Sequence, residues 1–158
     1  MEHPQVLLFA FLIGVIGGLR ALTAPAVTSW AAHLQWLNLL TSPLRFLGSM
    51  ITVVIFTILA CVELVTDQLP STPARTKAAG LVPRILLGGL CGAAVASAGG
   101  QSLALGGVLG AVGGVVGAFA GYEVRTRLVK ALGVPDFVIA VAEDAVAIGG
   151  GLFLLSRF

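Results

Sequence analysis

The chain has 158 residues, of which 58% are hydrophobic and only 10% are charged, and its mean hydropathy is +1.04. Because soluble domains carry about 25% charged residues, this composition predicts an integral membrane protein. A membrane-spanning helix takes about 20 residues, so residues 1–158 are expected to form a single transmembrane domain without a soluble catalytic domain. The net charge of +2 is too small and too scattered for a nucleic-acid surface.

Five charge-poor runs predict an all-α fold with about five transmembrane helices. The first run, residues 6–32, contains one charge, Arg20, and a proline, Pro25, that is expected to break or kink the helix. The second run covers residues 46–66, and the third, about residues 84–98, is short. A turn at residues 99–102 leads into the fourth, which ends at residue 122, and the fifth covers residues 137–156.

Basic residues predict the orientation of the chain. They gather in and beside two polar loops, residues 67–77 and 123–136, which a five-span model places on the cytoplasmic side. The same model places the N-terminus inside and the C-terminus outside. Residues 30–45 mix tryptophans, polar residues and leucines, which is typical of a stretch lying along the lipid headgroups.

Glycines recur every four residues, most clearly at Gly106, Gly110 and Gly114 and at Gly113, Gly117 and Gly121. This spacing predicts glycine-zipper packing, with two packing faces on a centrally placed fourth span. The alternative is a glycine-lined passage for a substrate.

A possible inverted repeat relates the two ends of the chain. Residues 14–18 resemble residues 110–114, and Glu63 would then correspond to Glu143. The two copies would have opposite orientations, as in many transporters.

Charged residues inside the apolar runs are the candidate site. Arg20 lies within the first run and Glu143 and Asp144 within the last, where a lone charge costs at least about 2.5–3.5 kcal/mol. We therefore expect Arg20 to pair with one of these two carboxylates, which point about 100° apart on a helix.

A second pair of carboxylates lies where the second run ends. Glu63 and Asp67 fall on one helix face, and Arg75 could fold back onto them. Supporting residues are Arg84, Arg125, Thr23 and Pro25; Pro25 frees a backbone carbonyl, a common ligand in broken helices. Salt bridges that only fix the packing of the helices would explain the same charges.

No nucleotide, cofactor or hydrolase motif is present, so no cofactor is expected and an enzyme is not favoured. A histidine-based metal site is improbable, and the identity of any metal stays open. Paired carboxylates and arginines acting on a lipid phosphate would be the enzymatic alternative.

Three motifs together resemble a known family. They are the segment from Gly17 to Pro25 with Trp30 after it, Glu63-x-x-x-Asp67-x-x-Pro70, and Glu143-Asp144. The chain resembles the small bacterial membrane proteins grouped as domain of unknown function 4126, although Gln68 stands where members often have lysine. The resemblance implies a bacterial cytoplasmic membrane and a compact multi-span fold, and it implies no activity.

The leading functional hypothesis is a small transporter or channel for a cation or a proton-coupled solute. Its site would be Arg20, Glu63, Asp67, Glu143 and Asp144, and a homodimer would help to enclose the path. The alternative is a non-transporting membrane protein that binds a lipid headgroup or a partner helix, because basic residues on the cytoplasmic side could contact anionic lipids.

Overall fold

The computed structural model describes residues 3–67 and 76–158. These residues form six α-helices, one short 3-10 helix and no β-strand, so the predicted all-α class is confirmed for the described part of the chain. The helices are α1 (His3–Leu19), α2 (Thr23–His33), η1 (Arg45–Gly48), α3 (Met50–Thr66), α4 (Ala78–Ala98), α5 (Leu103–Leu132) and α6 (Asp136–Leu155).

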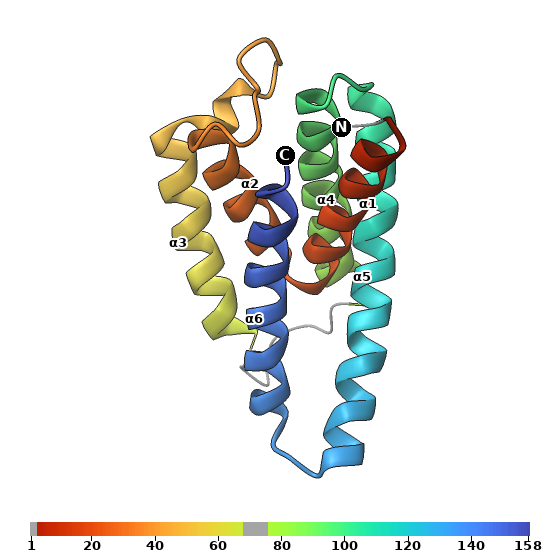
Figure 1. Ribbon diagram of the computed structural model, residues 1–158. Coiled ribbons are helices and arrows are strands. Elements are labelled where there is room, and N and C mark those ends of the chain that lie inside the picture. Colours follow the sequence, from red (N-terminus) through yellow and green to blue (C-terminus); the bar gives the residue numbers. More distant parts are fainter. Residues whose placement is uncertain (1–2, 68–75) are drawn as a thin grey trace.

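The first predicted span consists of two helices that run in opposite directions. α1 ends at Leu19, residues 20–22 are not helical, and α2 returns toward the end of the molecule where α1 began (Figure 1). We call residues 20–22 the helix break. The expected kink at Pro25 is wrong, because Pro25 lies in the first turn of α2, where its missing N–H has no intrahelical acceptor to lose.

Both described termini lie at the same end of the bundle (Figure 1). The ring of Phe158 is 6.1 Å from that of Phe9 in α1, which places the last residue beside the first helix. The five-span model expects the termini at opposite ends of the bundle, and the structure does not have them there. The helix break accounts for this difference. Residues 6–32 form two helices that run in opposite directions, so this segment begins and ends at the same end of the bundle.

α1, α4 and α5 form the most closely packed part of the molecule, in which helix backbones touch. A Cβ at Gly14 of α1 would lie 2.1 Å from the backbone oxygen of Gly110 of α5, and a Cβ at Gly110 would lie 2.2 Å from that of Gly88 of α4. Gly113 meets the backbone of α1 in the same way. Only glycine fits such contacts. α5 packs against both α1 and α4, which also contact each other, while its outer face is exposed, so the central position predicted for the fourth span is not seen.

The direction of α1 contradicts the inverted repeat. Gly14 lies against Gly110, and Gly18 lies against Gly114 and Gly117. The residue numbers therefore increase in the same direction along the two helices. α1 and α5 are thus parallel, as Figure 1 also shows, whereas copies of an inverted repeat would run in opposite directions.

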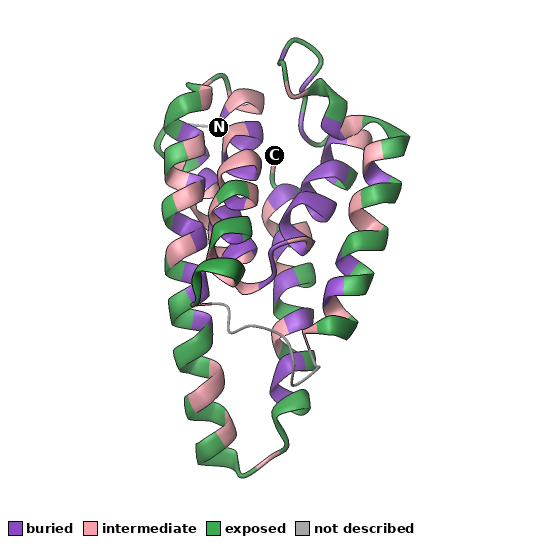
Figure 2. Cartoon of the chain, turned by 180° about the vertical axis from the view of Figure 1, so that it is seen from behind, coloured by how far each residue is buried: buried purple, intermediate pink, exposed green. Residues whose placement is uncertain are grey.

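α2 is the most buried helix of the fold. It packs against α3, α4 and α6, and nine of its eleven residues are buried. In Figure 2, α2 is almost entirely purple, while the lower part of α5 is largely green. The helix break therefore lies inside protein and not at the molecular surface.

Two predicted boundaries differ from the structure. α4 begins at Ala78, before the expected start near residue 84, and contains Pro83. α5 continues through the predicted polar loop as far as Leu132, because charged side chains do not end a helix; Gly133, with φ of 62°, ends it. The predicted turn at residues 99–102 is confirmed.

The segment at residues 30–45 lies at the same end as the termini (Figure 1). Trp30 and Trp36 are each 38% exposed, as expected for headgroup contact, but Leu37 and Leu39 are buried in the core. The segment thus folds partly back onto the bundle.

Three helices, α4, α5 and α6, are long and apolar enough to cross a membrane, and α1 and α3 are shorter apolar helices. The structure therefore supports a membrane protein, and the number of crossings belongs to the proposal below.

Candidate functional site

The helix break is held by two charged side chains from other helices. Both oxygens of Glu63 in α3 accept backbone N–H groups of the break, from Ala21 and from Leu22, each at 2.8 Å. On the other side, Nε of Arg84 in α4 donates to the carbonyl of Gly18 at 3.1 Å. A carboxylate thus meets the positive N-terminus of α2 and a guanidinium meets the negative C-terminus of α1, and both contacts stabilise the helix break.

Arg20, in the break itself, is completely buried and pairs with carboxylates from two helices. Its Nε donates to Asp144 of α6 at 2.5 Å, and its Nη1 pairs with Asp67 at the end of α3. The sequence left Glu143 and Asp144 open as partners, and the structure selects Asp144. The third guanidinium nitrogen of Arg20, Nη2, has no hydrogen-bond partner among the described residues.

Asp67 connects the two arginines of the site. Besides Arg20 it lies 3.6 Å from Nη2 of Arg84, whose Nη1 donates to the carbonyl of Gly80 at 2.6 Å. Glu63 and Asp67 do converge on one region as predicted, yet they act differently: Glu63 caps a helix and Asp67 bridges two guanidinium groups. We call Arg20, Glu63, Asp67, Arg84 and Asp144 the Arg20 cluster.

Glu143 and Arg125 belong to a second group of charges. Arg125 of α5 pairs with Asp136, at the start of α6, through two nitrogens, and its Nη1 lies 3.5 Å from Glu143. Glu143 therefore points away from Arg20, toward α5, as expected for neighbours on a helix. The Arg20 cluster and this group therefore lie on different faces of α6, about 100° apart.

The remaining sequence candidates have different positions. Thr23 is buried in the first turn of α2, and its hydroxyl has no partner among the described residues. Pro25 is buried in the same turn. Arg75 lies outside the described residues. Across residues 3–67 and 76–158, no group of three or more His, Cys, Asp or Glu side chains is placed to hold a metal ion.

A cavity of about 260 Å³ lies against the Arg20 cluster, and we call it the break cavity. Ala21 and Leu22 of the break, the charged side chains of Glu63, Asp67 and Arg84, and the apolar side chains of Pro83 and Leu87 line it. The break cavity therefore combines charge, helix-end backbone and an apolar wall.

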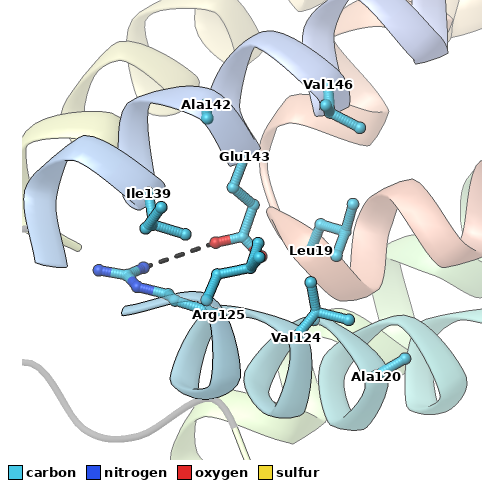
Figure 3. Close-up of a pocket in the computed structure, with 10 residues that line it drawn as sticks. Leu19, Ala120, Val124, Arg125, Ile139, Ala142, Glu143 and Val146 are labelled. Carbon is cyan, nitrogen blue, oxygen red and sulfur yellow. Dashed lines mark hydrogen bonds and ion pairs between the residues drawn. The ribbon is translucent and has the colours of Figure 1, made fainter. Parts of the chain in front are cut away.

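A second cavity, of about 290 Å³, opens between α5 and α6, and we call it the α5–α6 groove. Figure 3 shows Glu143 reaching across it toward Arg125, with Leu19, Val124 and Val146 on the apolar side. This groove is mainly apolar, with one ion pair at its edge.

Sequence reasoning missed two features of the site. It counted Arg84 only as a supporting basic residue, although this side chain caps α1, and it did not consider Asp136. The position of Arg84 beside Pro83, inside an apolar run, was the available signal for a buried role.

Apolar helices of membrane-crossing length, in a bundle that buries ion-paired charges, define a helical membrane protein. The chain belongs to the family described as Domain of unknown function (DUF4126), whose model matches residues 7–156. The matched region contains the whole Arg20 cluster, and the description assigns no activity. No curated protein and no solved structure shows a significant match to the chain.

Proposed function

We propose that this protein is a small membrane transporter for a cation or a proton-coupled solute, with the Arg20 cluster as its translocation site. The observation that carries the proposal is the completely buried guanidinium of Arg20, which carboxylates from two other helices share inside a break between two half-helices. Intramembrane charges are costly and mark transport pathways, and broken helices with exposed backbone groups form the binding sites of many transporters.

The proposed membrane placement has α3, α4, α5 and α6 crossing the bilayer, with α1 and α2 forming a re-entrant hairpin. α5 is about 45 Å long, which exceeds the roughly 30 Å hydrocarbon core, so its basic end extends into the headgroups. Arg125, Arg127 and Lys130 belong to the last turns of α5, and Lys77 directly precedes α4, so the basic residues gather on the side of the bundle opposite the termini, which we take as cytoplasmic. Both termini are then outside the cytoplasm, and the membrane is that of a bacterial cell.

The Arg20 cluster gives the proposed transporter a connection that can open. Arg20 ties the break to α3 and α6, and Arg84 ties it to α4, so four elements meet at charged contacts. When a carboxylate of the cluster takes up a proton, or a solute replaces it, the attraction to Arg20 falls and the half-helices are free to move. Solute binding and helix movement are coupled because the charged groups that bind the solute also hold the half-helices in place.

Solute flux into proteoliposomes tests the proposal. The wild-type protein is assayed with monovalent and divalent cations, with protons and with small anions, beside Asp144→Asn. Glu123→Gln is the matched control, because Glu123 is an exposed carboxylate whose ion pair within the described residues is with Arg127, one turn away on α5. We expect one class of solute to move in the wild type and in Glu123→Gln but not in Asp144→Asn. Flux in none of the proteins, or equal flux in all three, contradicts the proposal.

The α5–α6 groove favours a second function, the binding of a membrane lipid without transport. Its apolar walls suit an acyl chain, and the Arg125–Glu143 pair at its edge suits a polar headgroup. Ala142→Trp would fill the groove, whereas Ala145→Trp adds the same side chain at an exposed position that does not line it. This function predicts a lipid in mass spectra of the wild type and Ala145→Trp, its loss in Ala142→Trp, and no flux.

A homodimer also stays a proposal. The glycine faces of α5 are covered by α1 and α4 of the same chain, so a second copy would have to contact a different surface.

A further inference from the structure

A third cavity, of about 230 Å³, lies between α2, α3 and α6, and we call it the α2–α3–α6 pocket. In Figure 1 the ribbon of α2 lies between those of α3 and α6, and both helices pack against it. Thr23 and Val27 line the pocket from α2, Ala60 lines it from α3 and Ile148 from α6. Among the described residues, those that line the pocket carry no charge. The pocket is thus distinct from the break cavity and from the α5–α6 groove.

Thr23 gives this pocket a buried polar group that lacks a partner. The residue is 2% exposed, and its hydroxyl makes no hydrogen bond with any of the described residues. By contrast, the hydroxyl of Thr57 on the α3 wall donates to the carbonyl of Val53 at 2.7 Å and accepts from Nε1 of Trp30 at 3.1 Å. A buried hydroxyl without a partner costs free energy, and a ligand oxygen beside Thr23 would remove that cost.

The chemistry of the walls argues against three other occupants. A buried water molecule needs about two to four polar partners, and the walls are almost wholly apolar, with the hydroxyl of Thr57 already bonded. The acyl chain of a lipid would fill the pocket but leave the hydroxyl of Thr23 without a partner. A charged solute would find no opposite charge on the described walls. The occupant that fits is uncharged and mainly apolar, with an oxygen that forms hydrogen bonds.

The volume and the open side of the pocket set the size of this occupant and its route. An apolar cavity of about 150 Å³ holds benzene, so a volume of about 230 Å³ admits a six-membered ring with a short substituent. Trp30, which is 38% exposed, and Cys61, which is also exposed, line the pocket and mark its open side. In the proposed membrane placement this side faces lipid, so the occupant enters from the bilayer.

The α2–α3–α6 pocket lies directly beside the Arg20 cluster. Its wall includes the first turn of α2, which follows the helix break, and Leu64, which follows Glu63 in α3. Ile148 lies one turn after Asp144 in α6. A bound molecule therefore contacts helices that meet at the cluster and does not touch the charges of the cluster.

We propose that the α2–α3–α6 pocket binds a small, uncharged, lipid-soluble alcohol or ketone. Its oxygen hydrogen-bonds to the hydroxyl of Thr23, and its apolar body packs against Val27, Ile148 and Leu152. The hydroxyl of Thr23 donates to a ketone, and it donates to or accepts from an alcohol. This site goes beyond the proposed transport function and does not depend on it.

Tryptophan fluorescence of the purified full chain in detergent tests the site. The chain has two tryptophans, so in Trp36→Phe the remaining indole is that of Trp30, which lines the pocket. The probes are cyclohexanol, methylcyclohexane, which has a methyl group in place of the hydroxyl, and cyclohexylammonium. We expect Trp36→Phe to bind cyclohexanol more tightly than cyclohexylammonium. No saturable change with cyclohexanol, or tighter binding of cyclohexylammonium, overturns the inference.

Thr23→Val removes the hydroxyl and keeps the shape of the side chain. In the Trp36→Phe background we expect it to weaken cyclohexanol binding about three- to tenfold and to change methylcyclohexane binding by less than about twofold. Thr126→Val is the matched control, because Thr126 is exposed and its hydroxyl donates to the carbonyl of Tyr122; it should change neither affinity. Unchanged cyclohexanol binding in Thr23→Val, or an equal loss for both probes, contradicts the hydrogen bond.

The melting temperature of Thr23→Val without a ligand gives an independent reading. We expect it to be no lower than that of its parent, since the variant removes a buried polar group that has no partner. A clearly lower melting temperature would show that the hydroxyl is bonded within the protein, which contradicts the inference.

A second pair of variants keeps the test decisive if Thr23→Val does not fold. Ala60→Phe fills the pocket, whereas Ala145→Phe places the same side chain at an exposed position of α6 that does not line it. Cyclohexanol binding should be lost in Ala60→Phe and kept in Ala145→Phe. Equal affinity in both variants contradicts the site.

Discussion

Nε of Arg20 lies 2.5 Å from Oδ1 of Asp144, and this ion pair joins the end of α1 to the middle of α6. The two residues are 124 positions apart in the chain; Arg20 is completely buried and the side chain of Asp144 is 12% exposed. The pair therefore fixes how the first and last helices of the fold sit against each other.

Removing one partner of this pair should destabilise the protein more than removing both. Asp144→Leu leaves the guanidinium of Arg20 buried beside Asp67 alone, and we expect a loss of about 3–5 kcal/mol in the free energy of unfolding. The double variant Arg20→Met/Asp144→Leu should be more stable than Asp144→Leu, because apolar side chains replace both charges of this pair and Asp67 keeps Arg84 as a partner. Unfolding by a denaturing detergent measures both values. A double variant no more stable than Asp144→Leu would show that the pair is not the interaction that matters.

Lysine should not replace arginine at the helix break. The planar guanidinium of Arg20 places separate nitrogens against Asp144 and Asp67, and one ammonium group cannot reproduce this geometry. We expect Arg20→Lys to lower the free energy of unfolding by about 1–3 kcal/mol. Arg127→Lys, at an exposed pair on α5, should change it by less than about 0.5 kcal/mol. Similar melting temperatures for the two variants would argue against a guanidinium that contacts Asp144 and Asp67 through separate nitrogens.

Close contact between helix backbones should make Gly110 intolerant of a methyl group. A Cβ there would lie 2.2 Å from the backbone oxygen of Gly88, whereas a Cβ at Gly149 of α6 has nothing within 4 Å. Gly110→Ala should cost about 1–3 kcal/mol or prevent folding, and Gly149→Ala should be neutral or stabilise α6 by about 0.5–1 kcal/mol. Yield and melting temperature of the two variants in detergent provide the comparison, and a stable Gly110→Ala protein would contradict the packing.

Both termini should lie on the same side of the membrane, outside the cytoplasm. The chain reverses at the helix break, and the basic ends of α4 and α5 lie opposite the termini. Reporter domains active on only one side of the membrane, fused to each terminus in turn, measure this directly. We expect the same result from both fusions. Reporters on opposite sides would support five crossings and refute the re-entrant hairpin.

Part of the candidate site could be predicted from the sequence, because charges within apolar runs must find partners. Arg20 and the late carboxylates are an example, and so is the shared face of Glu63 and Asp67. The choice between Glu143 and Asp144 could not be made, since it depends on the rotation of α6 about its axis, which long-range packing sets.

The helix break could not be placed from the sequence. Residues 6–32 read as one apolar segment, and Pro25 drew attention to a position three residues after the end of the helix break. The reversal is stable because Glu63 and Arg84, distant in the chain, supply the hydrogen bonds that its ends lack. The sequence also failed to predict that residues 123–132 continue α5. Their charges suggested a loop, but charged residues four positions apart, such as Glu123 and Arg127, pair along a helix.

Flux through the double variant Arg20→Met/Asp144→Leu, in proteoliposomes loaded with the solute that the wild type moves, tests the central claim most directly. This variant keeps the packing between α1 and α6 while it removes the charges, so it separates a structural role from a role in transport. The account predicts a folded, reconstituted protein with no flux above empty liposomes, beside an active Glu123→Gln control. Wild-type flux through a stable double variant would show that the Arg20 cluster holds the fold together and does not carry the solute.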